Sequence, residues 1–279
     1  MNRQEIIAHL ADRSRLPWHC LSTCLRDPER STPLFLLLLE RKCRELPLSD
    51  EEDKALFFAI HVLGAQGAQE AFAPLKALLC RSPHSAAALV GDAIADTVPQ
   101  ILMAFGPHLS ADCWDVAVSP DCDWLVREAF LRCWTYHMLR QDVPAGIVAD
   151  RLRDFPAEAQ LRPDSFLWTA WLTAIADLGL EELLPDVEDA LQNGTIEIGA
   201  LALLPSDIDG FREDLQQAKH ARTVPARFAA WREQKSYVPF SGSHEDFVRA
   251  GRHIVAEVHA TDEGHLRAAE RAEPFDENK

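Results

Sequence analysis

The chain has 279 residues, of which 47% are hydrophobic, and it carries a formal net charge of −16 at pH 7. This charge argues against nucleic acids and anionic membrane surfaces as partners, because proteins bind both mainly through lysine and arginine. The chain has 12 glycines and 17 prolines, and the prolines stand singly, which is more typical of many short helices than of a β-sandwich.

The sequence also indicates where the protein works. Its first residues, MNRQEIIAHLADRSR, lack the apolar run of a secretory signal, and its most apolar stretch, residues 34–39, is too short to span a bilayer. Seven cysteines at irregular spacings are typical of reduced thiols rather than of a disulfide framework. We therefore expect a cytoplasmic protein without a membrane-spanning segment.

Helix signals alternate with short breaks along most of the chain. In SDEEDKALFFAIHVLG, Ser49 and Glu52 form a capping box, and apolar residues follow at helical spacing. Gly64 and Gly67 are expected to break this helix. A second helix is then expected over residues 69–80.

The rest of the chain continues this plan. We expect helices over the following ranges: 92–105, 110–118, 123–141, 145–155, 164–178, 180–194, 207–218, 226–234 and 245–260. The stretch SYVPFSGSH, residues 236–244, is expected to be a loop. Residues 1–260 are predicted to form one domain, with an N-terminal cap over 1–45, core repeats over 50–195 and C-terminal helices over 206–260. The polar tail, residues 264–279, is predicted to be disordered.

Two features indicate that these helices form repeats. Acidic residues open successive helices roughly every 30 to 40 residues, the spacing of helical-repeat proteins: Asp50, Asp92, Asp123 and Asp164. LGAQGAQEAFAPLKALL (63–79) also aligns with IADLGLEELLPDVEDAL (175–191) at an offset of 112 residues, which is about three repeats of 37. Stacked helix pairs share a continuous core that one pair cannot form alone. The predicted fold is therefore all-α, an α-α superhelix or solenoid of stacked antiparallel helical pairs.

The stretch 63–79 resembles the HEAT-type repeat of phycobilisome lyases, in which a glycine turn joins two helices and an acid followed by alanine opens the second. DWLVREAFLRCW (123–134) resembles the HEAT consensus at Val126, Arg127 and Ala129. Over roughly residues 50–220 the chain resembles an uncharacterised bacterial family catalogued as domain of unknown function 1186. That resemblance is carried by GDAIADTVPQILMAFG, WLVREAF and LGLEELLPDVEDALQNGTIE. It implies an α-solenoid of HEAT-like repeats and no particular activity.

Asp92 and Asp96 lie four residues apart in an otherwise apolar stretch. A carboxylate pair on one helical face can bind a divalent cation or share a proton. The alternative is structural: Asp92 caps a helix after Gly91, and Asp96 caps a segment that restarts with Pro99 in its first turn. A buried acid also needs a partner. Arg127 in the next repeat is the predicted partner, so that the pair would join two repeats.

Catalytic and metal-binding motifs are weak. Two groups of cysteine and histidine each lack the second close ligand pair of a structural zinc site: His19, Cys20 and Cys24, and His108, Cys113 and Cys122. The sequence has no phosphate-binding loop, nucleophile elbow or HExxH motif, so no cofactor or metal is expected. An enzyme would have to combine the two aspartates with a facing histidine, either His61 or His137.

Tryptophan is frequent in the predicted repeats. Trp168 and Trp171 are three residues apart and so share a helical face. Tryptophan is enriched at binding hot spots, and it also fills the space between stacked helices. Two interpretations of this pair therefore remain open, core packing and an exposed peptide-binding groove.

The predicted function is protein interaction. Repeat solenoids present an extended curved surface to a protein or peptide partner. The candidate binding residues are Asp92, Asp96, Arg127, Trp168 and Trp171. The alternative is a small-molecule or metal-dependent enzyme with a carboxylate and histidine site around the two aspartates. Nucleic-acid binding ranks last, because the sequence shows no basic stripe.

Overall fold

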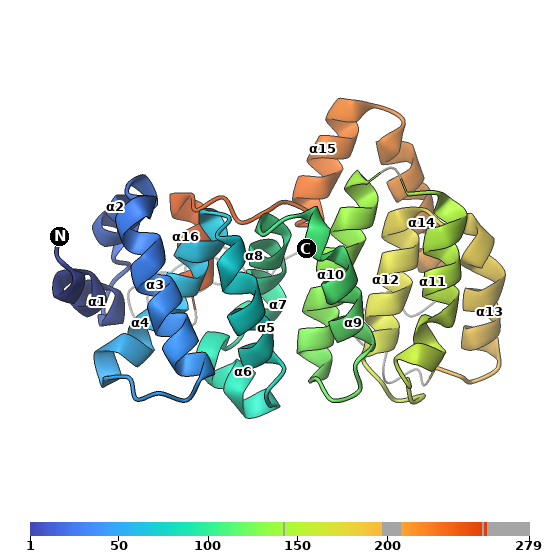
Figure 1. Ribbon diagram of the computed structural model, residues 1–279. Coiled ribbons are helices and arrows are strands. Elements are labelled where there is room, and N and C mark those ends of the chain that lie inside the picture. The colour runs from blue at the N-terminus through green and yellow to red at the C-terminus, as the bar shows by residue number, and fades with distance from the viewer. Residues whose placement is uncertain (142, 197–207, 253, 256–279) are drawn as a thin grey trace, which may run out of the picture.

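The computed structural model describes residues 1–141, 143–196, 208–252 and 254–255 of the chain. Every regular element within these residues is a helix, and none is a β-strand (Figure 1). The prediction of an all-α protein is therefore confirmed for the described part of the chain.

The described residues form a series of helices. In chain order the α-helices are α1 (Arg3–Ala11), α2 (Trp18–Arg26), α3 (Pro28–Cys43), α4 (Asp50–Ala65), α5 (Phe72–Leu79), α6 (Pro83–Val90), α7 (Ala93–Asp96), α8 (Val98–Ala104), α9 (Ser110–Val118), α10 (Trp124–Arg140), α11 (Ala145–Glu158), α12 (Leu167–Leu178), α13 (Leu184–Gln192), α14 (Ile208–Arg222), α15 (Pro225–Gln234) and α16 (His244–Gly251). Short 3₁₀ helices precede α5, α9 and α13, and they are η1 (Gln69–Ala71), η2 (Pro107–Leu109) and η3 (Glu181–Leu183).

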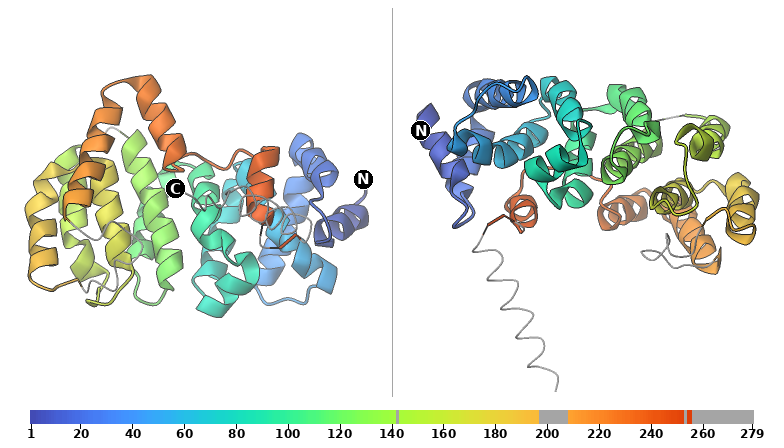
Figure 2. Two further views of the ribbon diagram at one scale, coloured as in Figure 1. Left: turned by 180° about the vertical axis from the view of Figure 1, so that it is seen from behind. Right: turned by 90° about the horizontal axis from the view of Figure 1, so that it is seen from below.

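The helices lie in two rows and a third, partial layer (Figures 1 and 2). The outer row contains α3, α5, α9 and α11, and the inner row contains α4, α8, α10 and α12. Neighbouring helices of the inner row pack directly on one another. From the outer row, α3 packs on α4, α9 packs on α10, and α11 packs on α12. The third layer, which contains α14, α15 and α16, lies on the side of the inner row that faces away from the outer row. At the N-terminal end, α1 packs on α4, and α2 packs on α3 and α4.

Local sequence signals place several helix starts as predicted. Ser49 accepts a hydrogen bond from the backbone of Glu52, whose carboxylate accepts one from the backbone of Ser49, so the capping box of α4 is confirmed. Asp123 caps α10 by accepting a 2.9 Å hydrogen bond from the backbone of Leu125. Each cap satisfies backbone N–H groups that the first helical turn leaves unpaired.

The predicted break at Gly64 is wrong, because α4 continues to Ala65. The turn is made by Gly67, whose φ of +60° is the left-handed conformation that glycine adopts without strain. Gly64 serves close packing instead, since a side-chain carbon added there would lie 2.8 Å from Cγ2 of Ile101 in α8.

The same junction recurs along the rows. Gly67, Gly106 and Gly179 have φ angles of +60°, +114° and +67°. Each glycine follows an inner-row helix and precedes a 3₁₀ helix and then α5, α9 or α13. The two stretches that align at an offset of 112 residues therefore share their turn geometry at Gly67 and Gly179.

The inner row is buried on all sides rather than along one stripe. Every residue of α4 from 55 to 64 is buried, and α10 and α12 are buried over most of their lengths. A helix that is apolar all round is typical of a position between two packed layers. The third layer is therefore part of the hydrophobic core.

Some predictions cannot be compared with the structure. Residues 256–279, which include the tail predicted over 264–279, lie outside the described residues. The helix predicted over 245–260 is too long: it ends at Gly251 as α16, with Arg252 as its C-cap, and residues 254–255 are not helical. Residues 256–260 of that prediction lie outside the described residues.

Alanine at Gly64 should separate the packing role of this glycine from a turn role. We expect Gly64→Ala to destabilise the protein by about 1–3 kcal/mol, the usual cost of overpacking a core, because its Cβ meets Ile101. Gly146→Ala, in α11, is the matched control, because a Cβ there has no heavy atom within 4 Å. It should be neutral or stabilising by up to about 1 kcal/mol. Urea unfolding followed by circular dichroism measures both, and equal midpoints for the two variants would contradict the packing role.

Candidate functional site

The C-terminal segment from Lys235 to Gly251, which we name the strap, runs back across the inner row (Figure 1). Residues 237–243 of the strap are not helical, and α16 follows. The backbone N–H of Phe240 donates a 3.0 Å hydrogen bond to the carbonyl of Gln100 in α8. The ring of Phe247, in α16, packs near Phe58 of α4. The strap therefore connects α15 with the opposite end of the inner row.

Three aromatic side chains anchor the strap. Tyr237 and Phe240 are each 2% exposed, and Phe247 is fully buried. Phe240 and Phe247 pack edge to face, and Phe240 also contacts the ring of His61 in α4. The predicted loop over 236–244 is thus an extended segment with a buried aromatic edge. The signal that could have revealed this burial is the spacing of aromatic residues in an otherwise polar stretch.

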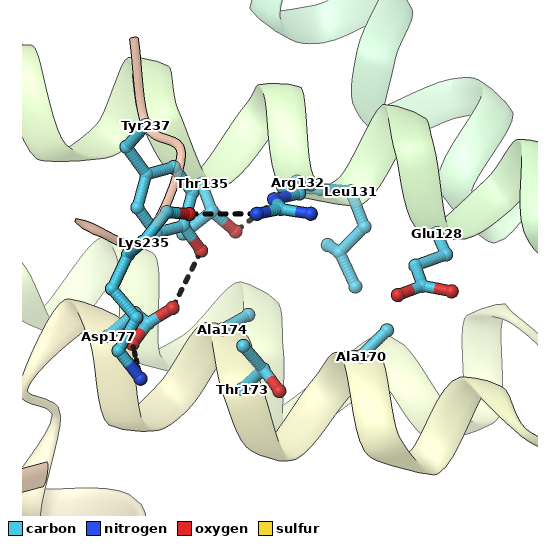
Figure 3. A pocket seen from close by; sticks show the side chains of 10 residues that line it. All are labelled: Glu128, Leu131, Arg132, Thr135, Ala170, Thr173, Ala174, Asp177, Lys235 and Tyr237. Atoms are coloured by element: carbon cyan, nitrogen blue, oxygen red, sulfur yellow. Dashed lines mark hydrogen bonds and ion pairs between the residues drawn. The ribbon is translucent and has the colours of Figure 1, made fainter. Parts of the chain in front are cut away.

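A cavity of about 160 Å³ lies where the strap crosses α10 and α12 (Figure 3). Asp177 of α12 is 1% exposed and accepts a 2.8 Å hydrogen bond from the Tyr237 hydroxyl through Oδ2. Its other oxygen, Oδ1, lies 3.5 Å from Nζ of Lys235. Burial raises the pKa of Asp177, and the Lys235 charge and the Tyr237 hydrogen bond oppose this rise.

A second carboxyl group lines the same cavity from α10 (Figure 3). Burial raises the pKa of Glu128, and the positive charge of Arg132 lowers it in part. Arg132 also donates a 2.8 Å hydrogen bond to the carbonyl of Lys235, and its guanidinium lies 5.8 Å from the centre of the Tyr237 ring. Two carboxyl groups with raised pKa values beside fixed cations are typical of binding sites, although structural networks also produce them. The arrangement can bind a polar group, and burial makes each of its carboxyl groups lose its proton at a higher pH than usual.

A larger cavity of about 550 Å³ lies farther along the strap, beside Phe240. Its walls include Tyr136 and His137 of α10 and Gln66 at the end of α4. Burial lowers the pKa of His137 to about 4, so its imidazole is neutral at pH 7. The strap therefore borders two cavities. Lys235 and Tyr237 line the smaller one, and Pro239 and Phe240 line the larger one.

The predicted pairing of an aspartate with Arg127 is wrong. Arg127 is buried and donates hydrogen bonds to the carbonyls of Ala117 and Ala159, at 3.0 and 2.7 Å. Asp96 instead forms an ion pair with Arg249 of the strap, with Nε 3.4 Å from Oδ1. The carboxylate that was predicted to join two repeats therefore joins the end of α7 to the strap.

The helix around Asp92 and Asp96 is interrupted as the structural alternative predicts, but its caps differ. α7 ends at Asp96, and α8 restarts after Thr97 with Pro99 in its first turn. Asp92 precedes α7, and its side chain makes no capping hydrogen bond. Thr97 precedes α8, so Asp96 does not cap the restarted segment.

The histidines predicted to face the two aspartates have other partners. His61 is buried, and its two ring nitrogens form hydrogen bonds of 2.7 Å with the Phe57 carbonyl and the Thr97 hydroxyl. Burial lowers the pKa of His61 to about 4. His137 contacts the thiol of Cys133. Within the described residues, no three histidine, cysteine or acidic side chains are arranged to hold a metal ion.

The groove interpretation of Trp168 and Trp171 is wrong, because these side chains are 3% and 2% exposed. Their indole N–H groups donate to the carbonyls of Arg162 and Leu152, at 2.9 and 2.6 Å. α12 packs between α10 and α14, so its tryptophans fill the core. The core-packing alternative accounts for both residues.

The chain was compared with protein-family models, with curated proteins and with solved structures, and none of them matches. Its likeness to HEAT-like repeats and to domain of unknown function 1186 therefore stays a prediction. No helix in the described ranges has both the length and the apolarity that crossing a bilayer requires.

Removing the Tyr237 hydroxyl should destabilise the protein in a pH-dependent way. In Tyr237→Phe, a buried carboxylate loses its hydrogen-bond donor, which costs about 1–3 kcal/mol. Because the folded-state pKa of Asp177 is raised, this group favours folding most at low pH, and that contribution is lost as pH rises through the folded-state pKa. The hydroxyl stabilises the ionised form, so its removal should cost most at neutral pH and less near pH 4.

The control is Tyr136→Phe, because the Tyr136 hydroxyl accepts a hydrogen bond from an exposed side chain, that of Arg140. We expect a change within about 0.5 kcal/mol for this variant. Thermal unfolding of both variants between pH 4 and pH 8 measures the difference. A Tyr237→Phe penalty that is the same at all pH values would contradict the role given to Asp177.

Proposed function

We propose that this protein is a helical-repeat interaction module of HEAT-like type that binds an extended segment of a protein partner along its inner row. The recurring junctions at Gly67, Gly106 and Gly179 support a repeat architecture. Repeat proteins use such arrays to present long surfaces, along which a peptide contacts several helices in turn. On this proposal the solenoid is short and contains the helix pairs between α3 and α13.

The observation that carries the proposal is the strap itself. An extended segment of this chain lies on the inner row, held by the backbone hydrogen bond from Phe240 to Gln100 and by buried aromatic side chains. Main-chain hydrogen bonds with pockets for a few side chains are a general mode of peptide recognition. A partner segment of similar chemistry would use the same surface in competition with the strap.

The contacts of the strap define the chemistry of the partner. Tyr237 and Phe240 provide aromatic anchors three residues apart. Lys235 pairs with Asp177 of α12, and Arg249 pairs with Asp96 of α7. The partner is therefore an extended protein segment with spaced aromatic residues and flanking basic residues. The net charge of −16 favours such a basic segment and disfavours nucleic acid.

Seven free cysteines agree with a reducing compartment, and we propose a cytoplasmic location. The alternative enzyme around Asp92 and Asp96 receives no support from the described residues. Asp96 is paired with Arg249, and both ring nitrogens of His61 bind other groups.

The proposal can be tested with the strap sequence as a separate peptide. A fluorescent peptide of residues 235–249, KSYVPFSGSHEDFVR, is titrated into the full chain and into Phe240→Ala. Loss of the buried ring weakens the strap, so its surface is open more often and the apparent affinity for the peptide rises. We expect Phe240→Ala to bind the peptide at least tenfold more tightly than the unaltered chain, about 1.4 kcal/mol.

Two controls accompany this titration. Phe166→Ala removes a ring that is 43% exposed and lies outside the strap, and it should bind the peptide no better than the unaltered chain. A peptide with its three aromatic residues replaced by alanine should bind neither protein. If Phe240→Ala fails to fold, Arg249→Ala weakens the strap through the Asp96 pair instead. Equal binding of the aromatic and alanine peptides would overturn the proposal.

A further inference from the structure

Two carboxyl groups that line the smaller cavity, of about 160 Å³, lack hydrogen-bond partners among the described residues. Asp177 is 1% exposed, and its Oδ1 is buried and accepts no hydrogen bond, whereas Oδ2 accepts one from Tyr237. The carboxyl group of Glu128 forms neither a hydrogen bond nor an ion pair with any described residue. A buried acceptor without a donor loses its hydration and gains no bond in return. Acceptors of this kind in a cavity are commonly satisfied by a bound molecule or ion.

The cavity is elongated along two packed helices. Figure 3 shows Glu128 at one end and Asp177 at the other, with small side chains of α12 between them. These side chains recur at helical spacing on one face of α12 and are Ala170, Thr173 and Ala174. Ala170 and Asp177 are seven residues apart, which is about 10 Å along the helix axis. A short aliphatic chain therefore fits between the two carboxyl groups.

Asp177 shares its cation with another acid. Nζ of Lys235 lies 3.5 Å from Oδ1 of Asp177 and 3.4 Å from Oδ1 of Asp214. Arg222 donates hydrogen bonds to the main-chain carbonyls of Asp177 and of the next residue, and it does not line the cavity. Lys235 is thus the one residue in the described ranges that forms an ion pair with the Asp177 carboxylate, and it serves two acids.

Glu128 lies four residues before Arg132 on α10, the spacing at which helical ion pairs form, yet these two side chains do not pair. Arg132 instead donates its hydrogen bond to the carbonyl of Lys235. Burial raises the pKa of Glu128, so a positive charge beside this carboxyl group would stabilise its ionised form. Glu128 and Arg132 are both half-buried, so this end of the cavity is accessible from solvent.

We propose that this cavity binds a small primary amine of about six non-hydrogen atoms. Its ammonium group pairs with Glu128, its aliphatic chain lies on Ala170 and Ala174, and a hydrogen-bond donor at its far end binds Oδ1 of Asp177. The volume is suitable, because a cavity of about 150 Å³ holds benzene, which also has about six heavy atoms. The cavity exists with the strap in place, so this inference does not depend on the proposed peptide binding.

The length of such a ligand also agrees with the cavity. A four-carbon chain with nitrogen at one end and oxygen at the other is roughly 6 Å long when extended. With a hydrogen bond of about 2.9 Å at each end it spans roughly 12 Å. This span is comparable to the length of α12 between Ala170 and Asp177.

The test uses 4-amino-1-butanol as the probe. It is titrated into the full chain at pH 7 by isothermal titration calorimetry, and 1,4-butanediol and 4-hydroxybutanoate are its neutral and anionic analogues. Salt at about 0.15 M screens attraction to the acidic surface beyond about 8 Å. We expect the amine to bind at least tenfold more tightly than the diol, and the anion not to bind. Failure of the amine to bind at millimolar concentration would overturn the proposal.

Glu128→Gln keeps the shape of the side chain and removes its charge, so the affinity for the amine should fall at least tenfold. Burial disfavours the ionised carboxyl group in the folded protein, so the thermal midpoint of this variant without ligand should not fall at pH 7. A purely structural role for Glu128 would lower that midpoint. Glu213→Gln, at an exposed position of α14, is the matched control and should bind the amine unchanged.

A second variant tests the cavity without changing a charge. Ala170→Leu places a larger side chain on the wall between the two carboxyl groups and should abolish binding of the amine. If this variant fails to fold, Glu128→Gln still decides the question. Equal affinity of the amine for the unaltered chain and for Glu128→Gln would show attraction to the acidic surface alone and would refute the site.

Discussion

The fold depends on the burial of an inner row of helices that is enclosed over most of its length. α4 is apolar through Phe57, Phe58 and Ile60, and α10 and α12 are similarly enclosed. Two rows alone would leave one side of this row in water, and each exposed phenylalanine or leucine would forgo about 1.5–3 kcal/mol. α14, α15 and the strap cover that side with residues more than 100 positions away in the sequence from α8 and α4. The core is therefore closed by contacts between the two ends of the chain.

Polar groups fix the position of the strap where the apolar contacts alone would permit sliding. At one end Lys235 and Tyr237 meet Asp177, and at the other Arg249 meets Asp96 and Gln100. The pKa of Asp177 is raised because its ionised carboxylate loses hydration when it is buried in the folded protein. In some proteins, buried polar pairs define which segments pack together more than they add stability. The same groups that define the register also line the cavity of Figure 3, so a ligand there would act on the strap directly.

The sequence predicted helix caps and turns, which depend on neighbouring residues. It did not predict contacts that form between distant segments of the chain. The caps at Ser49 and Asp123 and the turn at Gly67 were readable because each acts within four residues. The partner of Asp96 was not readable, since Arg249 is brought to it only by the return of the strap. Trp168 and Trp171 fit a groove or a core equally well from spacing alone, and the layer that covers α12 decides between them. The aromatic residues of the strap can be seen in the sequence, but the prediction of a loop gave no reason to expect that they are buried.

α10 lines both cavities beside the strap. Its middle contributes Glu128 and Arg132 to the smaller cavity, and Tyr136 lines the larger one. A rigid helix transmits a shift at one end along its whole length, because a packed core resists local deformation. A group that fills the smaller cavity would therefore act on Arg132, which is hydrogen-bonded to the strap at Lys235. Coupling between binding in this cavity and release of the strap requires that the bound group fits the two positions of the strap unequally, since a ligand with no preference between two states shifts neither of them.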